Sequence, residues 1–164
     1  MTKASLILAV SGVALAACVA VAPVEQTVVQ PPQPSAQEIV AARQAAVHMS
    51  GAAMGNIKAT IDGGGDPKSQ AYAARGLARW ARALPTMFPA GTAAVTPSRA
   101  RPEIWANKGD FNAKAASFAA AATELAAAAD SGDKEAFTAK WRATGATCGA
   151  CHQLYQAPQP SSGG

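Results

Sequence analysis

The chain has 164 residues and a formal net charge of +4, a size that fits one domain with short appendages. Its basic residues form no cluster with interleaved aromatic side chains, so the charge pattern gives no support to nucleic-acid binding. Alanine dominates, and β-branched and aromatic residues are few in the second half of the chain. This composition predicts an all-α protein and argues against a sheet.

Residues 1–17 have the pattern of an export signal, with Lys3 ahead of an apolar run that ends in small residues. The run is too short to span a bilayer as a helix, which takes about 20 residues. Leu15-Ala16-Ala17-Cys18 resembles the bacterial lipobox, which implies a lipoprotein signal peptide and diacylglyceryl transfer to the Cys18 sulfur. The alternative is an ordinary cleaved signal with an incidental cysteine. The lipobox resemblance predicts a periplasmic protein anchored to a bacterial membrane by its lipid.

Residues 18–34 are rich in proline, valine and glutamine, which predicts an extended, disordered tether ahead of the domain. Ser35 and Glu38 then have the spacing of a capping box, in which each side chain bonds the other residue's backbone N–H. A first helix over 36–61 is expected to follow, and the glycines at 63–65 to end it.

A second helix is predicted to end at residue 84, with Asp66 as its cap and Pro67 in its first turn. Four prolines mark residues 85–102 as a long crossover loop. The third helix is expected to start at Glu103 or Asp110 and to reach residue 130. A Ser-Gly-Asp turn then leads into a fourth helix over 133–156.

The fourth predicted helix carries a stripe of residues three or four positions apart, which places them on one inward face. The stripe consists of Phe137, Trp141, Thr144, Cys148, Cys151, His152 and Tyr155. Four helices of this length predict an antiparallel four-helix bundle over residues 35–156, with a disordered tail over 157–164. A cofactor attached to the stripe would be enclosed by the bundle.

Cys148-Gly149-Ala150-Cys151-His152 has the two-cysteine and histidine spacing of covalent haem attachment. The thiols can reach the two vinyl groups on one porphyrin edge, and His152 then supplies an imidazole ligand to iron. We therefore predict one haem c, attached to the C-terminal helix. A redox dithiol usually lies near a βαβ pattern, and structural zinc needs about four Cys or His ligands. A disulfide across two residues would be strained and would stabilise little.

The cysteine count supports both the lipid and the haem predictions. The chain contains three cysteines, an odd number for an exported protein. A lipid on Cys18 and a haem on Cys148 and Cys151 leave no thiol over. Export also fits the haem, because covalent attachment in bacteria takes place outside the cytoplasmic membrane.

The haem motif lies near the C-terminus and is accompanied by three other segments: Arg43-Gln44, Ala83-Leu84-Pro85 and Arg101-Pro102-Glu103-Ile104-Trp105. In these features the chain resembles the cytochrome c′ family, the class II c-type cytochromes, over about residues 36–156. The resemblance implies five-coordinate, high-spin iron with His152 as the only protein ligand. It also implies a distal side, opposite His152, that is closed by apolar residues.

The resemblance assigns roles to residues outside the motif. Arg43 would pair with a haem propionate, for which its cationic fork is suited. Val47 would stand over the open iron face, where the family usually has leucine or methionine. Phe88 and Phe118 would form further pocket walls. Low-spin relatives carry a ligating methionine near the position of Gln44, and glutamine argues against that variant.

Four more residues bear on the surroundings of the iron. Gln156 stands four positions after the ligand histidine, where the family often has a basic residue. His48 lies about 100° round the helix from Val47, so it is expected to point away from the haem. Met49 and Met54 are expected to fill the core rather than to bind iron.

An open iron predicts a haem protein that binds NO or CO, transfers electrons to an unidentified redox partner, or does both. The alternative is a low-spin, six-coordinate electron carrier of the same fold. Peroxidase chemistry would need a distal acid–base histidine, for which only His48 is available, so an enzyme is not expected. A structural role without haem would leave the protein colourless. A homodimer stays open, because family members often dimerise but alanine-rich faces alone do not predict it.

Overall fold

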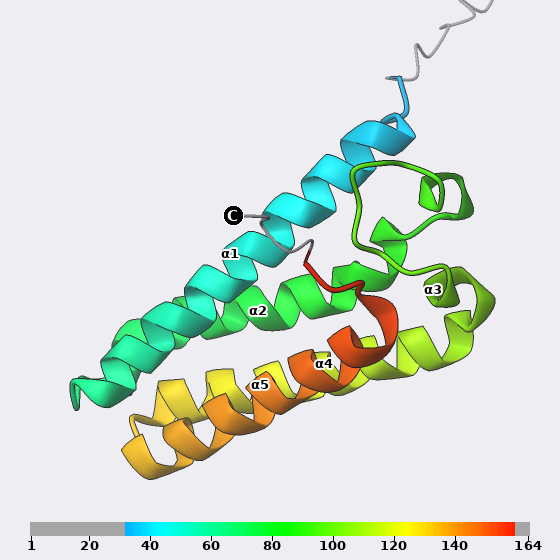
Figure 1. The fold of residues 1–164 in the computed structure, drawn as a ribbon. Coiled ribbons are helices and arrows are strands. Elements are labelled where there is room, and N and C mark those ends of the chain that lie inside the picture. Colours follow the sequence, from blue (N-terminus) through cyan, green and yellow to red (C-terminus); the bar gives the residue numbers. More distant parts are fainter. Residues whose placement is uncertain (1–31, 160–164) are drawn as a thin grey trace, which may run out of the picture. The chain divides into compact units, whose positions relative to one another are not determined.

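The chain is built from helices in the computed structural model, which describes residues 32–159 (Figure 1). The α-helices are α1 (Ala36–Asp62), α2 (Ala71–Ala83), α3 (Glu103–Ala106), α4 (Lys108–Ser131) and α5 (Lys134–Tyr155), with 3-10 helices at Pro67–Gln70, Leu84–Met87 and Ala90–Thr92. Successive long helices run in opposite directions, which confirms the predicted antiparallel four-helix bundle. The predicted signal peptide, the lipid site at Cys18 and most of the tether lie outside the described residues. None of the helices in 32–159 is both long and apolar enough to cross a membrane.

Helix α1 begins at the predicted capping box. The Ser35 Oγ accepts a hydrogen bond from the Glu38 N–H at 3.2 Å, and the Glu38 Oε2 accepts one from the Ser35 N–H at 2.7 Å. Because these bonds favour the carboxylate, they lower the pKa of Glu38. The helix ends at Asp62, one residue beyond its predicted end, and Gly64 then takes a left-handed conformation with φ of 63°.

The second predicted helix starts with a tighter turn than expected. The Asp66 Oδ1 accepts a hydrogen bond from the Lys68 N–H at 2.9 Å, so the predicted cap is present. The first turn is the 3-10 helix Pro67–Gln70, however, and α2 begins only at Ala71. Proline fixes the local backbone and lacks an N–H, which suits this short first turn.

The third predicted helix is divided in two. Helix α3 is a single turn that begins at Glu103, and Asn107 leaves the helical conformation before α4 begins at Lys108. The prediction of one helix with one start is therefore wrong, and asparagine, a weak helix former, marks the break. The turn to α5 is as predicted: Gly132 ends α4 with φ of 78°, and the Asp133 Oδ1 accepts a hydrogen bond from the Ala136 N–H.

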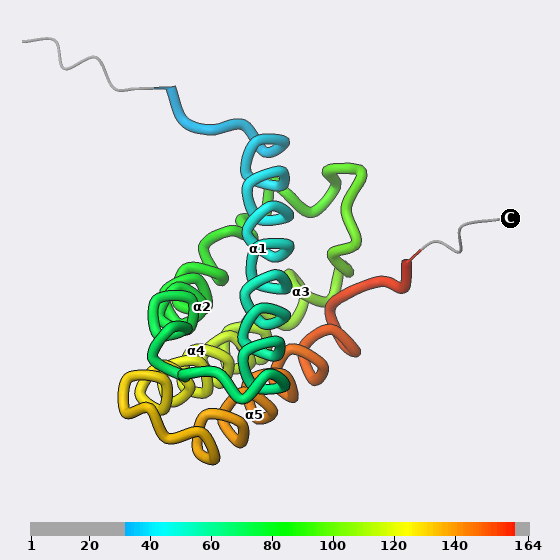
Figure 2. The backbone as a smooth tube through the Cα atoms, turned by 90° about the vertical axis from the view of Figure 1, so that its left-hand side faces the viewer, coloured from blue at the N-terminus to red at the C-terminus, as the bar shows by residue number. Residues whose placement is uncertain are grey.

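Helix α4 packs most extensively against α2 and α5, beside which it lies in the bundle (Figure 2). Ala74 of α2 and Ala122 of α4 are fully buried, and their small side chains let the helix backbones approach closely. Ile57, Leu125 and Phe137 add large buried side chains at the end where α4 turns into α5. We call this region the alanine-packed core.

Helix α1 has two different halves. Its C-terminal half, from Ala53 to Ile61, packs against the alanine-packed core. Its N-terminal half instead faces the crossover segment, residues 84–102, which connects α2 to α3. Only one half of α1 is therefore closed by direct helix packing.

The crossover segment is also joined to the end of α5. Ala100 pairs with Gln156 in an isolated antiparallel bridge, and the Ala157 N–H donates to the Arg99 carbonyl at 2.8 Å. The chain is therefore still held at Ala157, the first residue of the predicted tail. This connection brings the crossover segment beside the haem motif.

Candidate haem site

A cavity of about 580 Å³ lies between α1 and α5, with further walls from α2, α4 and the crossover segment. This volume is typical of pockets that bind a cofactor or small molecule. All the candidate residues that the structure describes line it: Arg43, Gln44, Val47, Phe88, Phe118, Cys148, Cys151 and His152. The remaining candidate, Cys18, lies outside the described residues.

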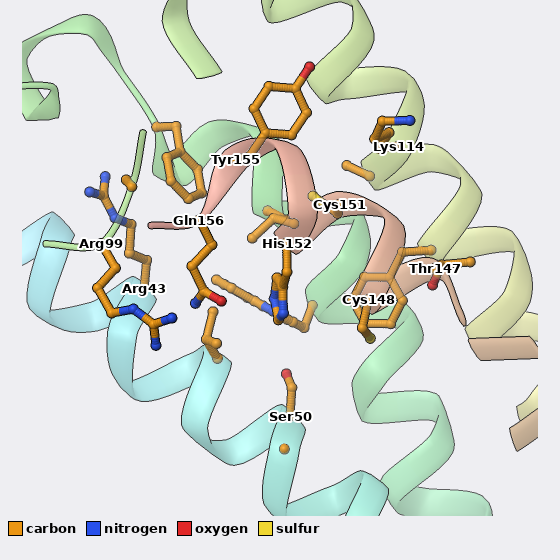
Figure 3. A pocket seen from close by; sticks show the side chains of 18 of the residues that line it. Arg43, Ser50, Arg99, Lys114, Thr147, Cys148, Cys151, His152, Tyr155 and Gln156 are labelled. Atoms are coloured by element: carbon orange, nitrogen blue, oxygen red, sulfur yellow. The ribbon is translucent and has the colours of Figure 1, made fainter. Parts of the chain in front are cut away.

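The two motif cysteines lie on α5, and both border the cavity (Figure 3). Burial raises the pKa of the Cys148 thiol and of the Cys151 thiol above the ordinary value. Since the thiolate is the reactive form of cysteine, this environment argues against a redox dithiol. Nowhere in residues 32–159 do three metal-ligating side chains of Cys, His, Asp or Glu gather, so the zinc interpretation has no support there.

His152 projects from α5 into the cavity, towards α1 (Figure 3). Partial burial and, to a smaller extent, the charge of Arg99 lower the pKa of His152. A neutral imidazole keeps a nitrogen lone pair available for iron. The predicted inward stripe is buried at Phe137, Thr144 and Tyr155, whereas His152 faces the open cavity and is only partly covered by protein.

Tyr155, one turn beyond the cysteines, is buried and fastens the end of α5 to the start of α4. Its hydroxyl donates to the Asp110 Oδ2 at 2.6 Å, and its ring packs edge-on against Phe111 with centroids 5.3 Å apart. The hydrogen bond to Asp110 raises the pKa of Tyr155 to about 12. This contact holds in place the helical turn that carries His152.

Arg43 is 3% exposed and holds the crossover segment to α1. Its Nη1 donates to the Met87 carbonyl at 3.2 Å and to the Thr92 Oγ1 at 2.9 Å, and its Nη2 donates to the Ser98 Oγ at 3.1 Å. The guanidinium carbon also lies 4.4 Å from the centroid of the Phe88 ring. Burial lowers the pKa of Arg43. The family resemblance implied a haem propionate as the partner of Arg43, and this role as a clamp was not predicted.

Two polar side chains of α1 that border the cavity, Gln44 and Ser50, have donors engaged elsewhere. The Gln44 Nε2 donates to the Pro97 carbonyl at 2.9 Å, and the Ser50 Oγ donates to the Ala46 carbonyl at 2.8 Å. Val47 lies between them on the cavity wall and is half-buried. Around Val47 this stretch of α1 therefore presents an apolar surface to the site, with His48 at its rim.

Two expectations about α1 need correction. His48 is exposed but borders the cavity, so the 100° turn from Val47 moves it to the rim and not to the far side. Met49 is 72% exposed, so its assignment to the core is wrong, because two residues from Val47 correspond to about 200° of rotation. Met54 is half-buried against the alanine-packed core, as expected.

Two further cations, Arg99 and Lys114, line the cavity and were not predicted from the sequence. The inward position of Lys114 could have been predicted from the helical period, because Lys114 lies one turn before Phe118 on the inward side of α4. Arg99 lies in the crossover segment, where no helical period indicates which side chains face inward. Only the fold places it beside the haem motif.

The residues present fit a covalent haem. Two thiols and an imidazole on consecutive turns of one helix border a single cavity. The other walls are mainly apolar, as a porphyrin requires, and include Leu77, Trp80, Phe88 and Phe118. Cations also border the cavity, and they are suited to the carboxylates that a haem carries.

The cytochrome c′ family model matches residues 38–156 of the chain. Cytochrome c′ of Rhodospirillum rubrum is 40% identical over 91 residues, which cover 56% of this chain and 62% of that protein. Cytochrome c-556 of Agrobacterium tumefaciens strain B2A is 36% identical over 70% of this chain and 93% of the relative. Cytochrome c′ of Pararhodospirillum photometricum is 32% identical over 74% and 98%.

Solved structures agree with this match. Crystalline cytochrome c′ from Thermochromatium tepidum superposes with a TM-score of 0.73 at 32% identity, over 77% of this chain and all of that chain. A nitric oxide complex of a leucine-to-isoleucine variant of Alcaligenes xylosoxidans cytochrome c prime has a TM-score of 0.69 at 27% identity, over 77% and 100%. The chain therefore belongs to the cytochrome c′ family, and its cofactor is one covalently attached c-type haem.

Proposed function

We propose that the chain is an exported haem protein with five-coordinate, high-spin iron, which binds NO and CO, transfers electrons, or does both. When bound, the haem supplies iron that exchanges one electron and offers a coordination position to a diatomic ligand. His152 is the only protein ligand in this proposal, and its neutral imidazole suits that role. Cys148 and Cys151 hold the group to α5 through thioether bonds.

The apolar face of α1 is the observation that carries the gas-binding proposal. Val47 lies between Gln44 and Ser50, and the donors of both polar side chains are engaged by backbone carbonyls. Bound O₂ gains from a nearby hydrogen-bond donor, whereas NO and CO bind iron without one. We therefore expect the site to favour NO and CO over O₂.

Two similar proteins of known structure add support for ligands and assembly. The Alcaligenes xylosoxidans protein binds nitric oxide in its variant complexes. Another cytochrome c′, 31% identical with a TM-score of 0.73, shows ligand-controlled dimer dissociation. For this chain we propose the same class of gaseous ligand and a homodimer. The chain spans only about 60% of the length of the first two curated relatives. Their activities are therefore not assigned to it directly.

The optical spectrum of the ferrous holoprotein tests the coordination state. A five-coordinate, high-spin pattern that changes on addition of CO or NO is the expected result. A low-spin, six-coordinate pattern without added ligand would overturn the proposal and favour the alternative electron carrier. Since His48 borders the cavity, the His48→Ala variant would then show whether that side chain is the sixth ligand.

A larger side chain at Val47 tests the position assigned to the gas. Val47→Phe should lower the affinity for CO by about tenfold or more, because the added ring occupies the apolar space on the cavity wall. Met49→Phe is the matched control, since that residue lies on the same helix but faces outwards. Equal CO affinities in both variants would show that the ligand binds elsewhere.

Export and anchoring form a separate part of the proposal. We propose that the mature protein is periplasmic and attached to a membrane through lipid on Cys18. Intact mass should include a diacylglyceryl group together with the haem. Cys18→Ser should yield a haem protein in the soluble periplasmic fraction. A wild-type mature chain without lipid mass would establish the ordinary cleaved signal instead.

A further inference from the structure

Arg99 is positioned by backbone pairing between the crossover segment and the end of α5. The Arg99 carbonyl accepts the Ala157 N–H at 2.8 Å, and the Arg99 Nε donates to the Ala157 carbonyl at 2.8 Å. The next residue, Ala100, pairs with Gln156. These contacts hold Arg99 close to the helical turn that carries His152, where it lines the cavity beside Gln156 (Figure 3).

The cations around the cavity differ in what already binds them. Arg43 is buried, and both of its Nη atoms donate to the crossover segment. Lys114 lies 4.0 Å from the Asp110 carboxylate. Arg99 uses only its Nε, and in residues 32–159 no carboxylate lies within 4.0 Å of its nitrogens.

This distribution leaves the Nη groups of Arg99 available for an anion. A paired fork of N–H groups on a side chain fixed at its Nε is suited to a carboxylate, because the fork is partly ordered before binding. The haem brings two such carboxylates, its propionates, into a cavity that Arg99 lines. Arg43 would have to release hydrogen bonds to the crossover segment to offer the same pair of Nη groups.

We propose that Arg99 binds a haem propionate, and that Arg43 acts mainly as the clamp between α1 and the crossover segment. The inference rests on the covalent haem alone and does not depend on gas binding. It gives the crossover segment a direct part in holding the cofactor. It also supplies a positive charge near His152 from the crossover segment, whereas residue 156, directly after α5, is an uncharged glutamine.

The test compares holoproteins carrying Arg99→Gln, Arg99→Lys and Arg101→Gln. Arg101 is the matched control, because it lies two residues away and its Nη2 is paired with the Glu103 carboxylate at 3.3 Å. Two properties are measured: the reduction potential and the propionate bands of the resonance Raman spectrum. Both variants lose the hydrogen bond from Arg99 Nε to the Ala157 carbonyl, but only lysine keeps the positive charge. The two variants therefore separate the effect of charge from the effect of losing that backbone contact.

Arg99→Gln should lower the reduction potential, since loss of a nearby positive charge favours ferric over ferrous haem. We expect about a threefold change in the redox equilibrium constant, or ~30 mV, given 59 mV per tenfold for a one-electron couple. The propionate bands should shift in Arg99→Gln, and Arg99→Lys should recover most of the potential. Arg101→Gln should change both readouts less.

Other outcomes would overturn the assignment. Unchanged propionate bands in Arg99→Gln would show that Arg99 does not bind the carboxylate. A band shift in Arg43→Gln or Lys114→Gln alone would assign the propionate to that residue. If Arg99→Gln and Arg101→Gln changed the reduction potential and the propionate bands equally, the effect would come from the net positive charge of the region and not from a bond between Arg99 and the propionate. None of these results would alter the proposal for NO and CO, whose affinities are measured separately.

Discussion

The alanine-packed core and the cavity beside α1 show two ways of closing the same bundle. In the core, fully buried alanines let α2 and α4 approach closely, and protein atoms fill the space between them. Beside α1, larger side chains surround about 580 Å³ that the protein leaves unfilled. Small side chains therefore close one part of the bundle directly, whereas the cavity is completed by a cofactor. The two parts should depend differently on the haem.

Removal of the haem attachment should have the largest effect. In the Cys148→Ala, Cys151→Ala double variant we expect a chain without covalent haem, because both thioether bonds are lost. Amide hydrogen exchange should speed up in the N-terminal half of α1 and in the crossover segment, while α2 and α4 stay more protected. Intact mass, absorbance and exchange mass spectrometry measure these results. Uniform loss of protection would show that the core does not stand independently of the cofactor.

Truncation of a large core side chain should have the second-largest effect, on the free energy of unfolding. Phe137 is 1% exposed, so Phe137→Ala should cost about 3–5 kcal/mol of unfolding free energy by leaving a void. Phe118→Ala is the matched change at the cavity wall, where the ring is only partly buried. It should cost clearly less in stability. Chemical denaturation of the two variants in the haem-free Cys148→Ala, Cys151→Ala background compares them, and equal losses would contradict the distinction between core and cavity.

Loss of the Arg43 clamp should have an intermediate effect. Arg43→Gln removes the charged donor from three acceptors in the crossover segment, and we expect a cost of about 2 kcal/mol. Arg75→Gln is a suitable control, because Arg75 pairs with Asp130 on the surface. An exposed pair of this kind contributes about 0–1 kcal/mol. If thermal or chemical unfolding gives the two variants the same stability, the clamp is not energetically important.

The smallest effect should be a pH dependence at the end of α5. Hydrogen bonding to Asp110 raises the pKa of Tyr155 to about 12, whereas an unfolded tyrosine has a pKa of about 10. The unfolded state thus loses its proton first, so stability should fall as the pH rises from about 10 to about 12. Tyr155→Phe should remove this part of the pH dependence. Denaturation at several alkaline pH values measures it, and an unchanged profile would show that other groups cause it.

Local features of the sequence predicted the starts of the helices well. Ser35 and Asp66 cap helices as expected, since a cap needs only a side chain and the backbone two or three residues away, and the predicted turn at 131–133 leads into α5. The periodicity of α5 likewise placed the haem motif on the correct helix. The break at Asn107 was missed, because a single weak helix former does not by itself end a helix.

The surroundings of the haem motif could be predicted only in part. Resemblance to the family identified Arg43 and Val47 as candidate site residues, and both side chains line the cavity. It did not identify the partners of Arg43 in the crossover segment, nor the outward orientation of Met49. Those properties depend on which elements lie against each face of α1. A helical period relates residues on one helix to each other and contains no such information.

By itself, the sequence determined the helical class, the capped helix starts and the five-residue motif that takes the haem, because each depends on residues close together in the chain. The tertiary structure decided that α1 stands away from α5 to leave a cavity, that Arg43 clamps the crossover segment, and that Arg99 lies beside the haem motif. These features arise from contacts between residues far apart in sequence. Their positions depend on how the packed helices and the connecting segment fit together in space.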